Sequence, residues 1–327
     1  MESGKPMVLI TETMPLIEEE KQVLSKYADI KIAESTDEQY LIEAVKDVDV
    51  IMVVYAEITE KIINSAPKLK GIVRYGIGVD NVDIQAASKR KIPVANVPDY
   101  CIGTVADHTF ALLLALNRKI LLADKALRSG ECRKWTSPSP KLMGLDLEGK
   151  TLGLIGVGKI GSAVAARAKG FGMRVIAYDP YVPKEIAEKL GIQLTDFETL
   201  LRNSDFISIH VPLTLETRGM IGEKELKQMK KTAYIINTAR GPIIQEEALY
   251  KALKNGWIAG AGLDVYEKEP PDSDNPLFKL ENVVLTPHIA YYTQEAIRRL
   301  EMSAVKEAIR ILQGQLPKNL VNKEVFV

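Results

Sequence analysis

The chain has 327 residues, of which 46% are hydrophobic and 26% charged, and its 43 basic residues balance its 43 acidic ones. This composition is typical of a globular protein of about two domains, and the formal charge of zero argues against nucleic-acid binding driven by counterion release. The chain contains no run of about 18 apolar residues and no secretion signal, so we expect a cytoplasmic protein without a membrane span.

Strand and helix patterns alternate over the first hundred residues. Amphipathic stretches at 17–26 and 37–46 predict helices. Short apolar stretches predict strands at Met7–Ile10, Ile30–Ala33, Val50–Val54 and Gly71–Arg74. The alternation predicts a parallel α/β domain. Because this part has no GxGxxG motif, we do not expect it to bind a dinucleotide.

Two glycines follow the last of these strands, within Arg74-Tyr-Gly76-Ile77-Gly78-Val-Asp80-Asn81. Glycines directly after a strand expose backbone N–H groups in a geometry suited to a carboxylate. An ordinary strand-to-helix turn would give the same pattern, and the residues alone leave both interpretations open.

A long apolar-periodic stretch, residues 104–129, predicts one helix that Gly130 ends as a C-cap. This helix is too hydrophobic for a lone surface element, so we expect it to lie between domains or between subunits. Residues 138–147 contain prolines and predict an exposed loop before the next strand.

The motif Gly156-Val157-Gly158-Lys159-Ile160-Gly161 lies between a predicted strand at 151–155 and a predicted helix at 162–169. The first glycine allows a tight turn, the second lets the backbone approach a pyrophosphate, and the third lets helix and strand pack closely. A second strand at 173–178 ends on Asp179, whose carboxylate suits the ribose hydroxyls of NAD and would repel the 2′-phosphate of NADP. The complete pattern predicts an NAD site.

Strands and helices continue to alternate after Asp179. The predicted strands are Phe206–Val211, Ala233–Asn237, Ile258–Val265 and Val283–Thr286, and the predicted helices lie near 196–203, 223–230 and 245–255. The chain is therefore predicted to have the α/β fold class, with two Rossmann-like, doubly wound parallel sheets. A further helix over 293–313 would return to the first domain and make that domain discontinuous.

Four charged or ionisable residues lie at the ends of three predicted strands: Asp264 ends its strand, and Arg240, Glu269 and His288 lie in the segments that follow the strands. Strand ends at one edge of a doubly wound sheet converge on the ligand. Reduction of a 2-oxo acid needs a hydride and a proton, and a protonated histidine supplies the proton near neutral pH. An arginine grips a carboxylate as a planar fork, and a carboxylate bonded to the imidazole favours its charged form.

Each of these residues also has a structural interpretation. Asp264 can cap its turn instead of binding the nicotinamide amide, and Glu269 can be a solvated loop charge. Of the other two histidines, His108 lies within the long predicted helix and His210 ends a strand, so we expect neither to act as the acid–base. Metal chemistry is not expected, because no cluster has ligand spacing, and neither is a disulfide between Cys101 and Cys132.

These blocks resemble the D-isomer-specific 2-hydroxyacid dehydrogenases across almost the whole chain. The resemblance implies catalytic roles for Arg240, Glu269 and His288. It implies NAD binding by Gly156, Val157, Gly158, Lys159, Ile160, Gly161, Asp179, Val211, Pro212, Thr217, Thr238, Ala239, Asp264 and His288. It implies substrate binding by Tyr55, Gly76, Ile77, Gly78, Arg240 and Tyr291.

The resemblance also implies a domain organisation and partners. A flavodoxin-like substrate domain would comprise 1–101 plus 291–327, and 102–290 would form the NAD-binding Rossmann domain. The partners would be a small 2-oxo or 2-hydroxy acid and a second copy of the chain, bound through the 102–150 region, with no nucleic acid and no membrane. We therefore expect an NAD-dependent oxidoreductase, either a glyoxylate or hydroxypyruvate type of reductase or a phosphoglycerate-dehydrogenase-like enzyme.

Within the family, Tyr178-Asp-Pro-Tyr181, His288-Ile-Ala-Tyr291-Tyr292 and the tail at 319–323 are similar to the branch of C-terminal-binding proteins and phosphoglycerate dehydrogenases. That branch includes NADH-sensing corepressors, which often have a tryptophan where this chain has Tyr291. The alternative function is therefore an NADH-sensing dimeric scaffold with weak dehydrogenase activity.

Overall fold

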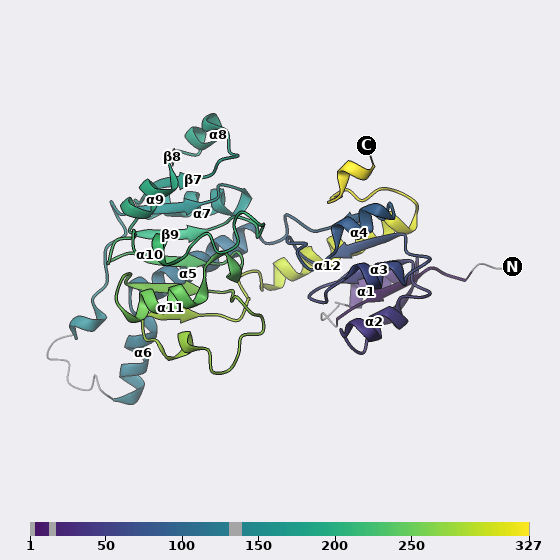
Figure 1. Cartoon of the computed structure of the whole chain (residues 1–327), viewed down its shortest axis with the longest axis horizontal. Helices are drawn as coiled ribbons and strands as arrows, with labels where there is room; N and C mark the ends of the chain where they lie inside the picture. The colour runs from purple at the N-terminus through teal and green to yellow at the C-terminus, as the bar shows by residue number, and fades with distance from the viewer. Residues whose placement is uncertain (1–3, 13–17, 131–138, 327) are drawn as a thin grey trace. The chain divides into compact units, whose positions relative to one another are not determined.

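The computed structural model of the protein describes residues 4–12, 18–130 and 139–326 (Figure 1). Contacts divide the chain into two compact units. The first unit consists of Met1–Cys101 and Thr293–Val327, and the second of Ile102–Tyr292. The first unit is therefore assembled from both ends of the chain. Among the described helices, none is both long and apolar enough to cross a bilayer.

The first unit has a five-stranded sheet in the order β2-β1-β3-β4-β5, in which every neighbouring pair is parallel. The strands are β1 Met7–Ile10, β2 Asp29–Ile32, β3 Val50–Val53, β4 Gly71–Arg74 and β5 Val94–Ala95. The helices are α1 Glu18–Ser25, α2 Glu38–Ala44, α3 Glu60–Asn64, α4 Ile84–Lys89 and α12 Gln294–Leu312. This strand order is that of flavodoxin-like sheets. All four residues of β3 are buried, because helices cover both faces of the sheet.

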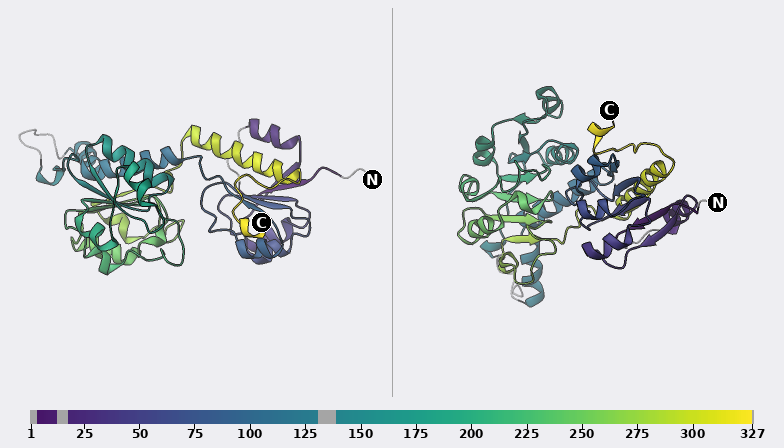
Figure 2. Two further views of the ribbon diagram at one scale, coloured as in Figure 1. Left: turned by 90° about the horizontal axis from the view of Figure 1, so that it is seen from above. Right: turned by 45° about the vertical axis from the view of Figure 1, so that its right-hand side comes forward.

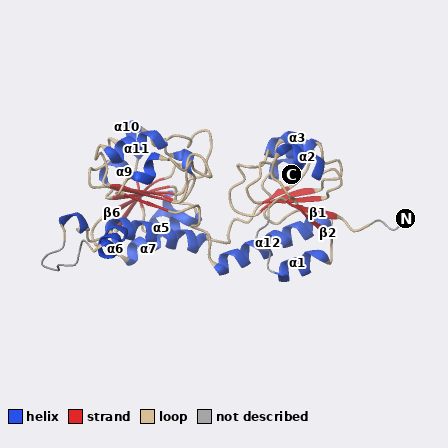
Figure 3. Cartoon of the chain, turned by 90° about the horizontal axis from the view of Figure 1, so that it is seen from below, coloured by secondary structure: helices blue, strands red, loops and turns tan. Residues whose placement is uncertain are grey.

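The C-terminal segment is built into the first unit. Helix α12 lies beside α1 on one face of the sheet, whereas α2 and α3 cover the other face (Figures 2 and 3). Ile311 of α12 packs so closely on Gly71 that a Cβ at Gly71 would lie 2.7 Å from its Cδ1. Beyond α12, the side chain of Asn322 accepts a bond from Val94 N at 2.9 Å and donates to Ile92 O at 2.9 Å. These contacts hold the C-terminal segment in the first unit, which therefore consists of two stretches of the sequence.

The second unit has a seven-stranded sheet in the order β12-β11-β10-β9-β6-β7-β8, again with parallel pairs only. Its strands are β6 Thr151–Ile155, β7 Arg174–Tyr178, β8 Gln193–Leu194, β9 Phe206–Ile209, β10 Tyr234–Asn237, β11 Gly260–Leu263 and β12 Val283–Leu285. Its helices are α5 Ile102–Asn117, α6 Ile120–Ser129, α7 Lys159–Gly170, α8 Lys184–Lys189, α9 Phe197–Asn203, α10 Glu223–Leu226 and α11 Glu246–Lys254.

In the second unit, α5 and α7 lie on one face of the sheet and α9, α10 and α11 on the other (Figure 3). Two apolar cores follow from this arrangement, one under each layer of helices. The strand order reverses between β6 and β9, and ligands of doubly wound sheets bind at the carboxyl ends of the strands beside such a reversal. The predicted fold class, α/β with two doubly wound parallel sheets, is confirmed.

The prediction of one helix over 104–129 is wrong. Helices α5 and α6 are separate, because Lys119 has a left-handed backbone with φ +55°. The buried Asn117 exchanges two hydrogen bonds with the backbone of Leu145, at 2.7 and 3.0 Å, and Lys119 Nζ donates to the Tyr234 hydroxyl at 2.8 Å. Apolar periodicity continues across this break and therefore does not reveal it. Gly130 is the C-cap of α6, as predicted, with φ +82°.

The sequence analysis also missed several short elements: β5, β8, α3, α4 and α8. Each has two to six residues, too few to show a periodic pattern. Residues 131–138, which contain Cys132 and the start of the predicted exposed loop, lie outside the described residues.

Candidate active site

The ends of three neighbouring strands gather the predicted catalytic residues. Strands β10, β11 and β12 lie side by side in the second unit, and the chain leaves their carboxyl ends at Thr238, Asp264 and Thr286. Arg240, Glu269 and His288 all lie in the segments directly after these strands. They therefore share one edge of the sheet, as the sequence led us to expect.

His288 and Glu269 form a hydrogen-bonded pair. The imidazole Nδ1 lies 2.6 Å from Glu269 Oε2, and Oε1 of the same carboxylate accepts a bond from Tyr266 N at 3.0 Å. The backbone of His288 is left-handed, with φ +54°, and its side chain is 27% exposed. Since Nδ1 is engaged by the carboxylate, Nε2 is the ring nitrogen that can meet a substrate. The ring of Tyr291 meets the imidazole edge-on, with 6.2 Å between the centroids.

The environment keeps Glu269 ionised. Burial by itself raises the pKa of the Glu269 carboxyl, but the hydrogen bond and charge of His288, the amide of Tyr266 and the charge of Arg240 together lower it below 4.5. An ionised carboxylate beside the imidazole balances its positive charge when the ring takes a second proton. The pair is thus suited to general acid–base chemistry.

Backbone contacts hold the turn that carries Arg240. The buried Asn237 accepts a bond from Ala239 N at 3.0 Å and donates to Arg240 O at 2.9 Å. The following Gly241 lies against the next loop so closely that a Cβ there would be 1.8 Å from the carbonyl oxygen of Tyr266. The guanidinium of Arg240 bonds back to Ala239 O at 2.8 Å. The turn therefore has little freedom, which favours a fixed position for the arginine.

Asp264 organises the loop that carries His288. Its fully buried carboxylate accepts bonds from Thr286 Oγ1 at 2.5 Å, Ile289 N at 2.9 Å and Ala290 N at 2.7 Å. The Asp264 carbonyl also accepts from His288 N at 2.8 Å. These contacts are the ones that the structural interpretation of Asp264 requires, and its contact with the nicotinamide amide stays a prediction. A carboxylate has about four acceptor sites, so room for one further donor remains.

The side chains of the other two histidines make hydrogen bonds within the second unit. His108 Nε2 lies 3.0 Å from Thr286 Oγ1 and so supports the Asp264 network from α5. His210 Nε2 lies 2.8 Å from Ser208 Oγ, and burial lowers the pKa of His210 from 6.5 to about 3. The imidazole of His210 is therefore neutral at physiological pH. The sequence analysis assigned no role to Thr286 and gave no sign of this network, because its partners are distant in the chain.

The glycine motif has the shape that a dinucleotide needs. Gly156 has φ +95°, and a Cβ there would lie 2.9 Å from the backbone of His210. A Cβ on Gly161 would lie 2.3 Å from Gly156 O, whereas a Cβ on Gly158 would meet no atom within 4 Å. Two of the glycines are therefore required by packing, and the third faces open space at the start of α7. Free N–H groups at a helix N-terminus bind phosphate, so this opening suits a pyrophosphate.

Asp179 closes the motif at the end of β7. Its carboxylate accepts bonds from Val157 N at 2.7 Å, Tyr181 N at 2.9 Å and Val182 N at 3.2 Å. About one acceptor site therefore remains for a ribose hydroxyl, although the sequence analysis expected Asp179 to meet both.

Two more predicted cofactor segments are held by hydroxyl groups. Thr217 Oγ1 donates to Pro212 O at 2.6 Å and closes the loop that follows Val211. Thr238 Oγ1 lies 3.1 Å from the buried Thr109 Oγ1 of α5. These bonds fix the backbone after β9 and β10, next to the strand-order reversal where a ligand of this fold binds.

The remaining predicted substrate residues belong to the first unit. Tyr55 is 55% exposed in the loop after β3. Gly76 has φ +148°, and its amide already donates to Arg74 O at 3.0 Å, so it is not available to a ligand. Among the described residues, the amides of Ile77 and Gly78 have no acceptor. These two N–H groups are therefore the ones suited to a carboxylate.

No group of three or more His, Cys, Asp or Glu side chains in the described parts of the chain is arranged to hold a metal ion. The buried thiol of Cys101 is not in a disulfide, and burial raises its pKa to about 11. The described residues are therefore suited to acid–base catalysis by a histidine. They are also suited to binding a carboxylate and a dinucleotide, through an arginine and backbone amides.

Comparison with known proteins agrees with this geometry. Residues 110–290 match the family model described as D-isomer specific 2-hydroxyacid dehydrogenase, NAD binding domain. The chain is 47% identical to a glyoxylate reductase of Thermococcus litoralis, with 98% of each chain covered. It is 44% identical to a D-3-phosphoglycerate dehydrogenase of Methanocaldococcus jannaschii, covering 97% of this chain and 60% of that protein. A D-lactate dehydrogenase from Aquifex aeolicus, solved with NAD and lactic acid, superposes with a TM-score of 0.88 at 32% identity over 97% of this chain and 99% of that one.

Proposed function

Because this chain belongs to the D-isomer-specific 2-hydroxyacid dehydrogenases and is an NAD-dependent oxidoreductase, we propose that it reduces glyoxylate and similar small 2-oxo acids, such as hydroxypyruvate, with NADH. The His288–Glu269 pair, bonded at 2.6 Å beside the Arg240 turn, is the observation that carries the proposal. We assign NAD binding to residues 102–290 and substrate binding to 1–101 with 291–327.

Each residue has a distinct part in this reaction. Bound NADH supplies the hydride that C2 of the 2-oxo acid accepts. Nε2 of His288 donates the proton that the carbonyl oxygen takes up, and Glu269 balances the imidazolium. The planar guanidinium of Arg240 pairs with the substrate carboxylate and polarises the carbonyl. Within the first unit, we assign carboxylate binding to the Ile77 and Gly78 amides.

The first test removes the proton donor. His288→Ala should lower turnover of glyoxylate by roughly 10²–10⁴-fold, which is the usual contribution of a general acid. NADH oxidation is followed at 340 nm, and NADH binding is measured separately by fluorescence. His108→Ala is a useful comparison, because His108 touches only the supporting network. Turnover that is unchanged in His288→Ala would show that the proposed proton donor is wrong.

We further propose a preference for NADH over NADPH. The Asp179 carboxylate lies at the end of β7, and residues 180–183 contain no arginine to meet a 2′-phosphate. The wild-type enzyme should therefore show a higher kcat/KM with NADH than with NADPH, and Asp179→Ala should narrow the difference. Equal kcat/KM values for the two cofactors in the wild type would contradict this assignment.

We also propose that the enzyme is a homodimer formed through the 102–150 region, of which residues 131–138 are outside the described structure. Helix α6 has no buried residue, and Ile120, Leu121 and Leu127 are each at least 50% exposed. Apolar side chains gathered on one helix suit a contact with a second copy. Leu121→Asp should shift the sedimenting species from dimer to monomer, whereas Lys125→Ala on the same helix should not. A wild type that sediments as a monomer would refute the proposal.

The cytoplasmic location expected from the sequence is likewise a proposal. A reducing compartment suits Cys101, whose buried thiol is not in a disulfide. Cell fractionation with an antibody against the chain tests this, and recovery outside the cytoplasmic fraction would contradict it.

A further inference from the structure

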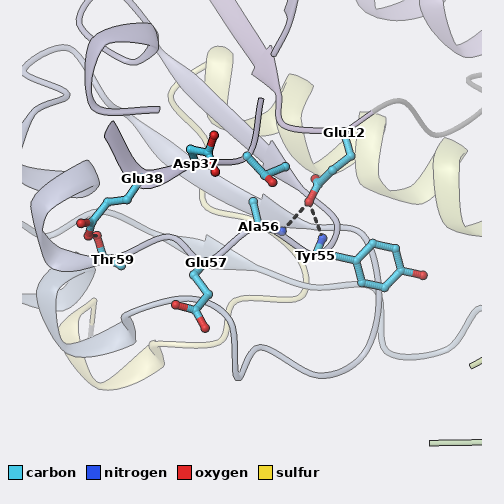
Figure 4. Close-up of a pocket in the computed structure, with 8 residues that line it drawn as sticks. Glu12, Asp37, Glu38, Tyr55, Ala56, Glu57 and Thr59 are labelled. Atoms are coloured by element: carbon cyan, nitrogen blue, oxygen red, sulfur yellow. Dashed lines mark hydrogen bonds between the residues drawn. The ribbon is translucent and has the colours of Figure 1, made fainter. Parts of the chain in front are cut away.

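A glutamate occupies an anion-binding nest in the first unit. Three successive backbone N–H groups after β3 point at the Glu12 carboxylate. Val54 N lies 3.0 Å from Oε2. Tyr55 N lies 2.8 Å from Oε1, and Ala56 N also donates to Oε1 (Figure 4). The hydroxyl of Thr11 donates to Oε2 as well. Successive N–H groups that converge in this way form a concavity that binds anions. With four donors, the acceptor sites of the carboxylate are filled.

The topology explains why Glu12 reaches this nest. Strand β1 pairs with β3 in parallel, so the chain that leaves β1 at Thr11 lies beside the chain that leaves β3. Thr11 N donates to Met52 O at 3.0 Å and extends the ladder by one step. Glu12 is therefore the first residue free to turn its side chain across the end of β3.

The nest lies next to the loop that we assign to the substrate carboxylate. Strand β4 is the other neighbour of β3, and Asn81, which follows the Gly76–Gly78 loop, donates to Val54 O at 3.3 Å and to Ala56 O at 2.9 Å. Neighbouring strands are about 4.8 Å apart, so the ends of β1 and β4 are separated by about 10 Å. The nest, which includes the amide of Tyr55, and the Gly76–Gly78 loop therefore lie at the same edge of the sheet, close enough for a C3 substituent of a 2-oxo acid bound at Ile77 and Gly78 to reach the nest.

The surroundings of the nest are acidic. A cavity of about 650 Å³ opens beside it, and four of the eight residues that line it are Glu12, Asp37, Glu38 and Glu57. None of the eight is basic. A substrate with a second negative charge would meet like charges here, and the amides that could have bound that charge are already taken by Glu12.

We propose that Glu12 determines substrate specificity: its carboxylate occupies the amide nest of residues 54–56 and thereby excludes 2-oxo acids that carry a second anionic group. The accepted class has only hydrogen on the carbonyl carbon C2, as in glyoxylate, or a neutral polar group on C3, as in hydroxypyruvate, and the excluded class has a phosphate or a second carboxylate. This inference rests on the proposed function, because it concerns the other end of the same substrate.

The first experiment measures selectivity. The ratio of kcat/KM for phosphohydroxypyruvate to kcat/KM for hydroxypyruvate is determined for the wild type, Glu12→Gln and Glu12→Ala. Removal of the charge should raise this ratio by about tenfold or more, because the repulsion acts at close range. Hydroxypyruvate differs from phosphohydroxypyruvate only in lacking the phosphate. The ratio is therefore insensitive to any effect of the substitution on binding of the substrate carboxylate or on hydride transfer. An unchanged ratio in both variants would overturn the proposal.

Glu57→Gln is the matched control. Glu57 lines the same cavity and is exposed, but its carboxylate is not on the nest. Loss of an exposed charge should change the ratio by about twofold at most. A change as large as that of Glu12→Gln would assign the effect to the general field of the cavity and would contradict a specific role of Glu12.

A second experiment does not depend on turnover. Inorganic phosphate is titrated into the protein while the amide resonances of Tyr55 and Ala56 are followed by NMR. In Glu12→Ala these amides should shift with saturation, and in the wild type they should not, since Glu12 fills the nest. Saturable shifts in the wild type, or none in Glu12→Ala, would refute the inference. If the wild type reduces no 2-oxo acid, the proposed function fails, and this titration still decides whether Glu12 closes the nest.

Discussion

Replacing Glu269 by glutamine isolates the contribution of the carboxylate to catalysis. The variant keeps the shape of the side chain and an oxygen for Tyr266 N, but it loses the negative charge that lies 2.6 Å from His288 Nδ1. A charge-assisted hydrogen bond contributes about 1.5–3 kcal/mol. About a third of each side chain is exposed, 27% for His288 and 33% for Glu269, so the lower end of that range, about 1.5 kcal/mol, applies.

This energy translates into a loss of rate. A free energy of 1.36 kcal/mol corresponds to a factor of about ten in rate, so kcat/KM for glyoxylate reduction by Glu269→Gln should be about tenfold lower than that of the wild type. The direction follows because the ionised Glu269 balances the positive charge of the imidazolium, whereas the glutamine amide does not.

The assay is NADH oxidation at 340 nm with glyoxylate at intervals from pH 5.5 to 9.5. Glu267→Gln provides the control, because Glu267 lies on the same loop and its carboxylate accepts a bond from the amide of Glu246 at 3.3 Å rather than from His288. Equal kcat/KM values for the wild type and Glu269→Gln throughout this pH range would refute the argument that the carboxylate contributes to catalysis through His288.

Three further predictions concern the frame of the site. Gly241→Ala places a Cβ 1.8 Å from the Tyr266 carbonyl, so the free energy of unfolding measured in urea should fall by about 1–3 kcal/mol and turnover should decrease. Gly170→Ala is the control, because its Cβ would meet no atom within 4 Å, and it should change neither quantity. Asp264→Asn removes the charge that holds two amides of the His288 loop and should cost about 3 kcal/mol in the same assay; an unchanged unfolding midpoint would contradict this. Because burial lowers the pKa of His210 from 6.5 to about 3, the unfolded chain binds a proton that the folded chain does not, and stability should fall by up to about 1.4 kcal/mol per unit as the pH drops below 6.5. His210→Gln should lose this part of the pH dependence, and identical slopes in the two proteins would show the argument to be wrong.

The sequence by itself determined the fold class and the order of most of its elements. In parallel α/β proteins, buried strands and amphipathic helices have local signatures, so strands such as β1, β4 and β6 were predicted at their observed bounds. The glycine motif is local as well, because its three glycines and the start of helix α7 all lie within six positions of Gly156. The alignment of Arg240, Glu269 and His288 on one edge also followed, since the carboxyl ends of parallel strands share an edge.

The tertiary structure alone decided which side chains hold which backbone groups. Asp264 bonds to the His288 loop, and Glu12 bonds to the amides of residues 54–56; both contacts join segments more than 20 residues apart. The break between α5 and α6 at Lys119 is also accompanied by contacts between distant segments. A side chain bonded to a distant backbone leaves no periodicity and no motif, because its partner is fixed only when the strands are placed side by side. The order of strands and helices could therefore be predicted from the sequence. The contacts that we propose to orient the acid–base pair and to select the substrate could be identified only in the folded structure.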